Sequence, residues 1–315
     1  MIVVLTGGTG GAKFVQGLKQ VMPPRELAFI VNTGDDLRWW GLHVSPDLDS
    51  ITYALAGMPS RERGWGVEGD TFQCLEAMRR LGAPAWFQLG DRDLALHISR
   101  TEMLAAGKPL SLATSEIARA MGIESRILPM TDDRLETRIQ TPAGELSFQE
   151  YFVRERYQVA VERVFFAGAE QAGPAPGVVE AIAQAECVLI APSNPVTSIG
   201  PILAVPGIRE ALRQTPARVA AVSPIVGGAA VSGPAGELMR TQGLTVSAEG
   251  VAQAYADFLD VLIADERDAA EKTAVERLGV ELRTARTVMR SDADRAALAW
   301  AALEIVRSPA AAVTP

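Results

Sequence analysis

Short apolar runs recur along the chain, and small polar residues follow most of them. Such runs cover residues 2–5, 28–31, 188–191, 219–222 and 261–264. Continuous apolar runs of this length between helical segments are typical of buried parallel strands, because helices cover both faces of such a sheet. The pattern therefore predicts an α/β fold built on an open parallel sheet.

The first four of these runs end in residues that favour ligand binding over packing. The ends read Thr6-Gly7, Asn32 to Asp36, Pro192 to Pro195 and Ser223 to Gly228. In an open parallel sheet, ligands bind beyond the carboxyl ends of the strands. An ordinary polar loop explains one such end easily and four together less well, so we expect the functional site at this edge of the sheet.

Two helix starts follow the second run. Ser45 stands at an N-cap position with Pro46 at the first helical position, a combination that favours a helix from there. Asp70 and Gln73 have the spacing of a capping box, and Gly82 is placed to end the helix that they begin.

The middle of the chain mixes helical and strand patterns. Residues 100–122 are mostly helical in pattern, and residues 137–141 and 145–148 flank a Pro-Ala-Gly turn, as expected for a hairpin. We therefore divide the chain into a core of residues 1–84 and 171–315 and an inserted, mixed α+β region of residues 85–170 that caps the site. The small, proline-flanked tail from Ser308 onward is typical of a frayed end.

The first run leads into a turn that carries four glycines, Gly7, Gly8, Gly10 and Gly11, before an amphipathic helix. Such a turn lets backbone N–H groups approach a phosphate, and the helix N-terminus favours an anion. It is not a P-loop, and it misses the dinucleotide fingerprint because Lys13 stands at the third glycine position. A tight turn that only packs strand on helix is the alternative. The ammonium of Lys13, on the first helical turn, favours the phosphate cradle.

Acidic residues follow the second run and the helix starts. Asp47 and Asp49 would hold a divalent metal or accept a proton from an attacking hydroxyl, or they only offset the helix dipole. Asp35 and Asp36 have the same alternatives. For Asp70 an N-cap role competes with a metal role.

Residues 88–93 form an acidic and basic loop after a strand predicted at residues 86–87. The loop would bind phosphate, recognise a polar ring edge, or form a solvated ion-pair turn. His43 and His97 are the two histidines, and without a Ser or Cys nucleophile elbow we do not expect triad chemistry. Zinc spacing is absent from the sequence, so any metal is expected to be a hard, oxygen-liganded one.

Hydroxyl and amide side chains follow the third run. Ser193, Asn194 and Ser198 suit hydrogen bonds to a base or ribose, and N-capping of the next helix is an equal alternative.

Composition narrows the function classes. The chain has 315 residues, 48% of them hydrophobic and 22% charged, with a net charge of −8. Because no basic stripe occurs, we expect no nucleic-acid partner. The sequence shows no signal peptide, and no apolar run approaches the roughly 20 residues of a membrane span, so a cytoplasmic protein without a membrane partner is expected. Cys74 and Cys187 are expected to be core thiols.

Taken together, these segments resemble the 2-phospho-L-lactate transferase family (CofD/FbiA), which makes the deazaflavin coenzyme F-420. The matching stretches are 7–13, 31–36, 41–49, 89–93, 191–195, 223–225, 232–235 and 265–268, in family order over essentially the whole chain. One departure is Gly11-Ala12, where archaeal members often have Thr-Pro.

The resemblance implies a doubly wound, Rossmann-like core and an inserted region that helps to hold the deazaflavin Fo. It also implies a reaction with Mg²⁺ as cofactor. The terminal ribityl hydroxyl of Fo attacks the phosphorus that bears a three-carbon acid in a guanosine-diphospho donor, and GMP leaves. Phospholactate, phosphoenolpyruvate and a phosphoglycerate are the candidate acids. A homodimer is expected.

The resemblance also assigns residues. Asp49 is expected to lie against the Fo hydroxyl as metal ligand or base, and Gln88 is expected to contact Fo. The glycine turn and the Ser193-Asn194 loop are expected to hold the guanosine diphosphate. The full substrate-binding set is Gly7, Gly8, Thr9, Gly10, Gly11, Lys13, Asn32, Asp36, Gln88, Asp91, Arg92, Ser193, Asn194 and Ser198, and the candidate metal ligands are Asp49 and Asp70.

Two rival functions come from the glycine turn. One is a regulatory protein of a related family with a Gly-Gly-Thr-Gly start, which binds a UDP-sugar and transfers nothing. The other is a nicotinamide oxidoreductase, which Lys13 at the third glycine position and Asn32 at the end of the second run both disfavour, because an acid is expected there.

Overall fold

The core of the protein is a parallel sheet of seven strands. A computed structural model describes residues 1–60 and 63–308, so the predicted frayed tail beyond Ser308 lies outside the described residues. The strand order is β14-β13-β10-β9-β1-β2-β5, and every neighbouring pair is parallel. The strands are β1 (Ile2–Thr6), β2 (Leu27–Val31), β5 (Arg126–Pro129), β9 (Cys187–Ile190), β10 (Arg218–Val222), β13 (Val261–Asp265) and β14 (Glu281–Ala285).

Alternating side chains of these strands enter two separate cores. Val3 and Leu5 of β1 belong to one buried cluster, and Ile2 and Val4 belong to the other. The first is covered by α6 (Val178–Ala183), α7 (Gly200–Ala204), α8 (Ile208–Gln214), α9 (Ala235–Thr241), α10 (Ala248–Tyr255) and α11 (Lys272–Glu276). The second is covered by α1 (Gly8–Val21), α2 (Pro46–Ala56), α5 (Leu110–Ala120) and α12 (Asp292–Arg307). Helices on both faces explain why the strands read as unbroken apolar runs.

The chain order reverses between β1 and β9. From β1 the chain continues to β2 and β5 on one side, whereas β9, β10, β13 and β14 extend the sheet on the other. This is the switch point of a doubly wound sheet, and ligands bind in the crevice that it leaves. The turn after β1 and the loop after β9 are therefore neighbours, as the pairing of Leu5 with Ile190 requires.

The predicted α/β fold is confirmed, and so are all five strands expected from the apolar runs. The strand predicted at residues 86–87 is wrong, because these residues form a bend. The edge strands β5 and β14 were not predicted. The sequence of β14, E-L-R-T-A, lacks a continuous apolar run because this edge strand is partly exposed. In β5, R-I-L-P, all residues except Arg126 are buried, but the apolar stretch is short.

Two regions outside the main sheet extend from its carboxyl end. One contains the hairpin β3 (Leu37–Trp39) and β4 (Leu42–Val44), followed by α3 (Gln73–Arg80) and α4 (Asp91–Ala105). The other is an antiparallel sheet of β6 (Glu136–Thr141), β7 (Gly144–Ser147) and β8 (Arg163–Ala167), with the π-helical turn Glu150–Arg154 beside it. A short hairpin, β11 (Ile225–Val226) and β12 (Ala229–Ala230), follows β10.

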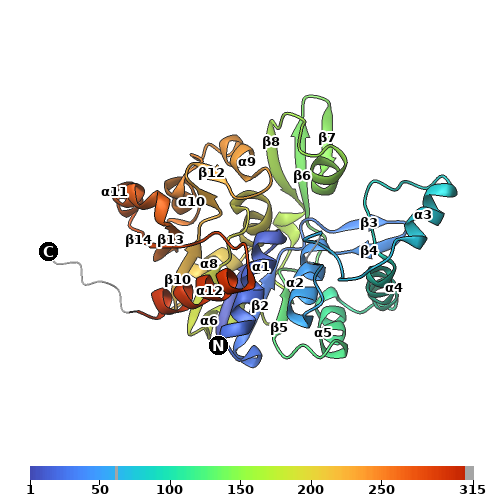
Figure 1. Cartoon of the computed structure of the whole chain (residues 1–315), viewed down its shortest axis with the longest axis horizontal. Helices are drawn as coiled ribbons and strands as arrows, with labels where there is room; N and C mark the ends of the chain where they lie inside the picture. The colour runs from blue at the N-terminus through green and yellow to red at the C-terminus, as the bar shows by residue number, and fades with distance from the viewer. Residues whose placement is uncertain (61–62, 309–315) are drawn as a thin grey trace.

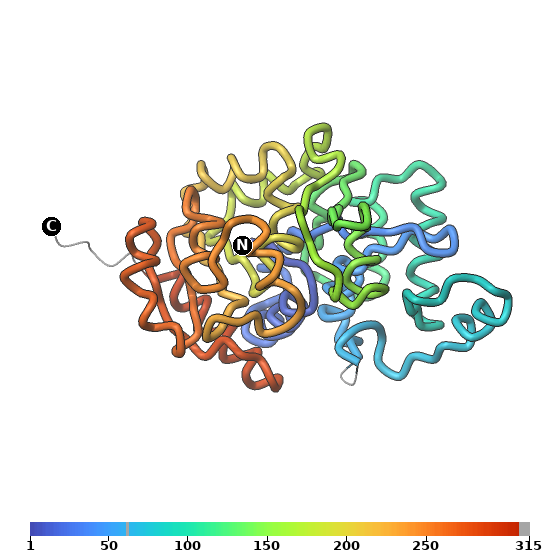
Figure 2. Tube along the Cα trace, turned by 90° about the horizontal axis from the view of Figure 1, so that it is seen from above, coloured from blue at the N-terminus to red at the C-terminus, as the bar shows by residue number. Residues whose placement is uncertain are grey.

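Figure 1 shows β6, β7 and β8 at the top of the view and α3 at the end of the long axis opposite α11. Figure 2, seen from above, shows residues 63–105 well separated from residues 248–308. The predicted hairpin is confirmed by β6 and β7. The range 85–170 is not a separate insertion, because it contains β5, which belongs to the main sheet, and α5, which packs on that sheet.

Two further findings concern membrane spans and the two cysteines. No helix in residues 1–60 and 63–308 is long and apolar enough to cross a membrane. Cys74 is exposed and Cys187 is buried, and both are free thiols, so the expected core position holds for Cys187 and is wrong for Cys74.

Candidate active site at the switch point

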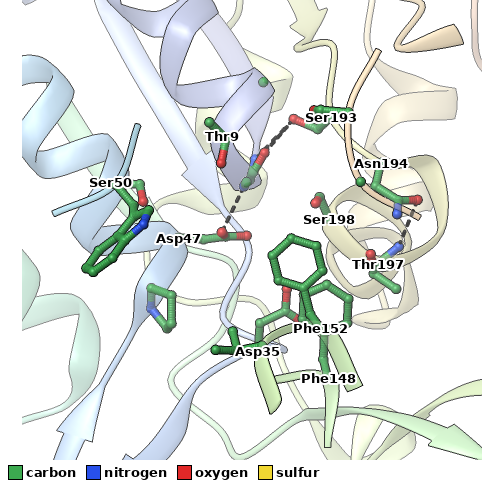
Figure 3. Close-up of a pocket in the computed structure, with 18 of the residues that line it drawn as sticks. Thr9, Asp35, Asp47, Ser50, Phe148, Phe152, Ser193, Asn194, Thr197 and Ser198 are labelled. Carbon is green, nitrogen blue, oxygen red and sulfur yellow. Dashed lines mark hydrogen bonds between the residues drawn. The ribbon is translucent and has the colours of Figure 1, made fainter. Parts of the chain in front are cut away.

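A cavity of about 860 Å³ opens where the chain order reverses. Its walls come from the turn after β1, the start of α2, the first half of α4, the loop at residues 86–89, the π-helical turn, and the loops after β9 and β10. Figure 3 shows Thr9, Asp47, Ser193 and Ser198 around this cavity, with Phe148 and Phe152 reaching in from the β6–β8 region. The volume suits a nucleotide together with a second substrate.

Two backbone N–H groups of the glycine turn, those of Gly7 and Gly8, already donate hydrogen bonds to side chains of the protein. Gly7 N–H donates to Ser193 Oγ (3.3 Å), which in turn donates to Gly7 O (2.7 Å), and Gly8 N–H donates to Asp47 Oδ1 (2.8 Å). Thr9 and Gly10 supply the next two amides at the start of α1, and no described residue outside the helix accepts from them. These two amides are therefore the ones available to an anion.

Lys13 adds a positive charge at the same end of α1. Its side chain is half-buried and lines the cavity. It forms no ion pair within the part of the chain that the structure describes, so its ammonium is available to a phosphate.

Glycine is required at the positions of this turn chiefly because a side chain there would overlap neighbouring atoms of the protein. A Cβ at Gly10 would overlap the carbonyl oxygen of Pro192, and a Cβ at Gly11 would overlap Thr6 Oγ1. A Cβ at Gly7 would lie 2.5 Å from Asp47 Oδ2, and Gly8 has a φ of +67°. The two interpretations of this turn therefore hold together: the glycines let it pack on the β9 loop, and the packing leaves the amides of Thr9 and Gly10 open.

Asn32 holds two carboxylates side by side at the end of β2. Its amide donates to Asp35 Oδ2 (3.1 Å), to Asp47 Oδ2 (2.9 Å) and to Thr197 O (3.2 Å), while its Oδ1 accepts from Gly34 N–H (2.8 Å). Asn32 is fully buried and does not line the cavity. It is therefore a positioning residue and not the direct substrate contact that we predicted.

Asp35 and Asp47 form no ion pair with any described cation. Burial raises the pKa of Asp47 to about 6, against the hydrogen bonds from Asn32 and Gly8 that favour its charged form. Burial, together with the charge of Asp47, raises the pKa of Asp35 well above its usual value. Both side chains line the cavity, and Asp35 Oδ1 has no hydrogen-bond partner. Two crowded, unneutralised carboxylates are a suitable place for a cation.

Asp49 has a different environment, because α4 supplies its partner. Arg100 donates to both of its oxygens, to Oδ2 at 3.3 Å and through a shorter bond to Oδ1. His97 Nδ1 lies 3.6 Å from Asp49 Oδ2, and its Nε2 lies 3.2 Å from Asp93 Oδ1, which also accepts from Tyr53. Apart from Arg100, all of these side chains line the cavity.

Several predicted residues lie outside the cavity and stabilise its surroundings. Asp36 accepts from Ser45 Oγ (2.7 Å) and contacts His43 Nε2 (2.9 Å), which ties β4 and the start of α2 to the loop after β2. Arg92 is exposed and donates to the carbonyl oxygen of Glu68 (3.3 Å).

The side chains of Asp70 and Asp91 cap the N-termini of two helices: Asp70 caps α4, and Asp91 caps α3. Asp70 accepts from the N–H groups of Arg92 (2.8 Å) and Asp93 (3.1 Å) at the start of α4. Asp91 accepts from the N–H groups of Gln73 (3.0 Å) and Cys74 (2.9 Å) at the start of α3. Asp70 therefore caps a helix N-terminus, as predicted, but it caps α4 and not the helix α3 that directly follows it.

The structure brings most of the predicted set together. The residues that line the cavity are Gly7, Gly8, Thr9, Gly10, Lys13, Asp49, Gln88, Ser193, Asn194 and Ser198, and those that do not are Gly11, Asn32, Asp36, Asp70, Asp91 and Arg92. Ser198 presents a hydroxyl without a described partner, whereas Asn194 Oδ1 already accepts from Val196 N–H (2.9 Å).

Aromatic side chains form two walls that were not in the predicted set. Trp86 and Phe87 meet edge to face, with ring centroids 6.0 Å apart. Phe148 and Phe152 stack, with centroids 5.4 Å apart and an angle of 9° between the rings. Nothing in the local sequence marks Phe148 and Phe152, because the turn that carries them reaches the cavity only through tertiary packing.

Comparison with known proteins gives relatives over almost the whole chain. The family model described as 2-phospho-L-lactate transferase CofD matches residues 2–309. A 2-phospho-L-lactate transferase of Methanosarcina mazei is 45% identical over 290 residues, which cover 92% of this chain and 95% of that protein. A phosphoenolpyruvate transferase of Streptomyces griseus is 46% identical over 310 residues, 96% of this chain and 98% of that protein.

A solved structure shares the fold. The crystal structure of a UPF0052-family protein from Bacillus halodurans has a TM-score of 0.64 and 18% identity, covering 96% of this chain and 98% of that one. At that identity the likeness concerns the architecture alone.

Proposed function

Because the chain belongs to the CofD family of 2-phospho-L-lactate transferases, we propose that it transfers a phosphorylated three-carbon acid from a guanosine-diphospho donor to the terminal ribityl hydroxyl of the deazaflavin Fo. The hydroxyl oxygen bonds to the phosphorus that bears the acid, the bond from that phosphorus to the GMP oxygen breaks, and GMP leaves. Relatives named for phospholactate and for phosphoenolpyruvate support both acids as candidates.

The observation that carries the proposal is the presence of an anion cradle and an acidic helix start in one cavity. Thr9 and Gly10 offer their amides and Lys13 its ammonium, and Asp49 lines the same space. Phosphoryl transfer depends on positioning and charge neutralisation more than on covalent catalysis. The cavity supplies both and contains no Ser–His or Cys–His pair among the described residues.

The diphosphate of the donor is assigned to the β1 side of the cavity. There the cradle faces the loop after β9, where Ser198 offers a hydroxyl to the nucleoside. Ser193 supports the cradle from behind, because its hydroxyl is engaged by Gly7. In dinucleotide-binding enzymes an acidic residue at the end of the second strand binds the ribose. Here that position is occupied by Asn32, which is buried, and this disfavours the oxidoreductase alternative.

The acceptor is assigned to the side where α2 and α4 meet. Gln88, Trp86 and Phe87 form that wall, and aromatic rings suit a flat tricyclic ligand. Asp49 accepts a hydrogen bond from the ribityl hydroxyl and takes its proton as the new bond to phosphorus forms. Arg100 holds the Asp49 side chain in place for this role by donating to both of its carboxylate oxygens.

The residues present also fit Mg²⁺, though at Asp35 and Asp47 and not at the candidate metal ligands Asp49 and Asp70. Asp35 and Asp47 line the cavity as neighbouring carboxylates without a cation, and they would hold the ion together with phosphate oxygens and water. No described group of three or more acidic, His or Cys side chains would enclose a metal alone. When bound, Mg²⁺ neutralises charge on the diphosphate. Asp49 fits less well because Arg100 occupies its oxygens, and Asp70 because it caps α4.

The product tests the proposal. Purified protein is incubated with Fo, Mg²⁺ and each guanosine-diphospho acid in turn, and the product mass is measured. A mass equal to Fo plus the phospho-acid supports transfer. Titration with GDP and with UDP-N-acetylglucosamine tests the regulatory alternative, since binding of the UDP-sugar without GDP binding or product would contradict the proposal.

A further inference from the structure

The cavity contains two residues with permanent positive charge, Lys13 and Arg156, within the part of the chain that the structure describes. Lys13 belongs to the anion cradle on α1. Arg156 comes from the loop that follows the π-helical turn Glu150–Arg154 and also lines the cavity. The four carboxylates that line the cavity are Asp35, Asp47, Asp49 and Asp93.

The backbone at Arg156 adopts an unusual conformation. Arg156 and Tyr157 are consecutive left-handed residues, with φ of 52° and 46°. This region is unfavourable for any residue with a Cβ, and residues held there tend to occur at ligand-binding sites. Neither is a glycine, so the surrounding structure must impose the conformation.

Contacts around the turn hold it in place. Tyr151 is fully buried, and its carbonyl oxygen accepts from Tyr157 N–H (2.9 Å). The ring of Tyr157 stacks on Phe152, with centroids 5.7 Å apart and an angle of 21°. The left-handed pair thus reverses the chain directly after the turn, and it presents Arg156 at the cavity wall.

The neighbouring acids leave Arg156 without a partner. Glu150 and Glu155 are the acidic residues of this turn, and Arg154 pairs with both, at 2.8 Å each. No described residue forms an ion pair or hydrogen bond with the Arg156 side chain. Its guanidinium is therefore free to bind an anion in the cavity.

We propose that Arg156 binds the carboxylate of the three-carbon acid in the donor and so determines that the transferred group is an acid. This inference rests on the proposed function. The donor carries a diphosphate and a carboxylate, and the cradle with Lys13 meets only the first. The carboxylate must avoid four aspartates, and the planar guanidinium of Arg156 matches it with two parallel hydrogen bonds.

A pair of donors tests the proposal directly. In one donor the diphosphoguanosine carries lactate, and in the other it carries an isopropyl group, in which a methyl replaces the carboxylate. Affinity is measured by titration in the wild type and in Arg156→Gln. We expect the wild type to bind the lactyl donor about 10- to 100-fold more tightly, as for hydrogen bonds to a charged group. Arg156→Gln should lose this preference and bind the isopropyl donor as the wild type does.

Two controls separate this role from a structural one. Arg163→Gln changes an exposed arginine of β8 that lies over Phe165 and does not line the cavity, and it should keep the preference. Arg156→Lys should keep part of it. GDP affinity should be unchanged in Arg156→Gln, and an equal loss for GDP would overturn the proposal by placing Arg156 on the diphosphate.

The outcomes for the two proposals are distinguishable. A preference for the lactyl donor that survives in Arg156→Gln overturns the role of Arg156, whether or not transfer to Fo occurs. Absence of transfer by a wild type that binds GDP and Fo contradicts the proposed function. In that case the preference for the lactyl donor over the isopropyl donor still shows whether Arg156 binds the carboxylate.

Discussion

Asp49 and Arg100 form a buried ion pair that joins the start of α2 to the middle of α4. Arg100 is 2% exposed and Asp49 is 4% exposed, and the guanidinium donates to both carboxylate oxygens. The pair fixes the carboxylate at the cavity wall and balances its charge. Asp49 is therefore better suited to orient a hydroxyl than to hold a metal ion.

Breaking this pair should destabilise the protein. Arg100→Met leaves Asp49 buried without its cation, which costs about 3–5 kcal/mol of unfolding free energy. The double variant Asp49→Asn/Arg100→Met should recover part of the loss. Urea unfolding measures both. Arg79→Met, which removes an exposed pair with Glu76, should stay within about 1 kcal/mol of the wild type. Equal losses for Arg79→Met and Arg100→Met would contradict the buried role.

Asp47 should make the metal-free protein less stable as the pH rises. Its pKa is raised from 3.8 to about 6 by burial, so the folded state binds more protons than the unfolded state between these values. Stability is therefore fully present below about pH 4 and is lost as the pH rises through about 6, by about 3 kcal/mol. In Asp47→Asn the part of this decrease that Asp47 causes should be absent, while the buried Asp35 keeps its own contribution. A difference in unfolding free energy between wild type and variant that does not change from pH 4 to 7 would contradict it.

Removal of Mg²⁺ should stop transfer, and the aspartates should differ in their effect. With GDP present, Mg²⁺ should raise the melting temperature of the wild type, because a ligand that binds only the folded state stabilises it. Asp35→Asn and Asp47→Asn should each lose this increase. Asp70→Asn should keep it, since Asp70 lies outside the cavity. Full activity in a chelator, or loss of the increase in Asp70→Asn alone, would argue against a site at Asp35 and Asp47.

The glycine turn should tolerate no side chain at position 10. Gly10→Ala places a methyl group against the carbonyl oxygen of Pro192, which is backbone and has little room to move. We expect a loss of about 1–3 kcal/mol in unfolding free energy and weaker GDP binding. Gly173→Ala is the matched control, because its new methyl group would have 3.9 Å to the nearest heavy atom. Similar stability of the two variants would mean that the packing of Gly10 is not required.

The sequence was sufficient for those parts of the fold that follow from a local pattern. Strands buried on both faces, such as residues 2–6 and 27–31, read as continuous apolar runs. The polar ends of β1 and β9 indicated the edge of the sheet where the cavity lies. The edge strand β14 could not be found in this way, because partial exposure removes the pattern, and the apolar stretch of β5 is too short to show it.

Interactions between distant segments account for the rest. Asp70 has capping-box spacing to its own helix, and yet its carboxylate binds the amides of α4, more than 20 residues along the chain. Arg156 reaches the cavity through a left-handed backbone that its sequence does not suggest. Burial in the folded protein raises the pKa values of Asp35 and Asp47, and nothing in the local sequence shows that these side chains become buried.

Fo-dependent release of GMP tests most directly whether one cavity joins the donor to the acceptor hydroxyl. We measure it with Mg²⁺ and a guanosine-diphospho acid, in the wild type and in Asp49→Asn, with GDP affinity as the control for an intact cradle. We predict that the wild type releases GMP only when Fo is present, one for each phosphodiester formed. Asp49→Asn should be slower by about 100-fold or more while it binds GDP normally. GMP release without Fo, or at an equal rate in Asp49→Asn, would contradict this.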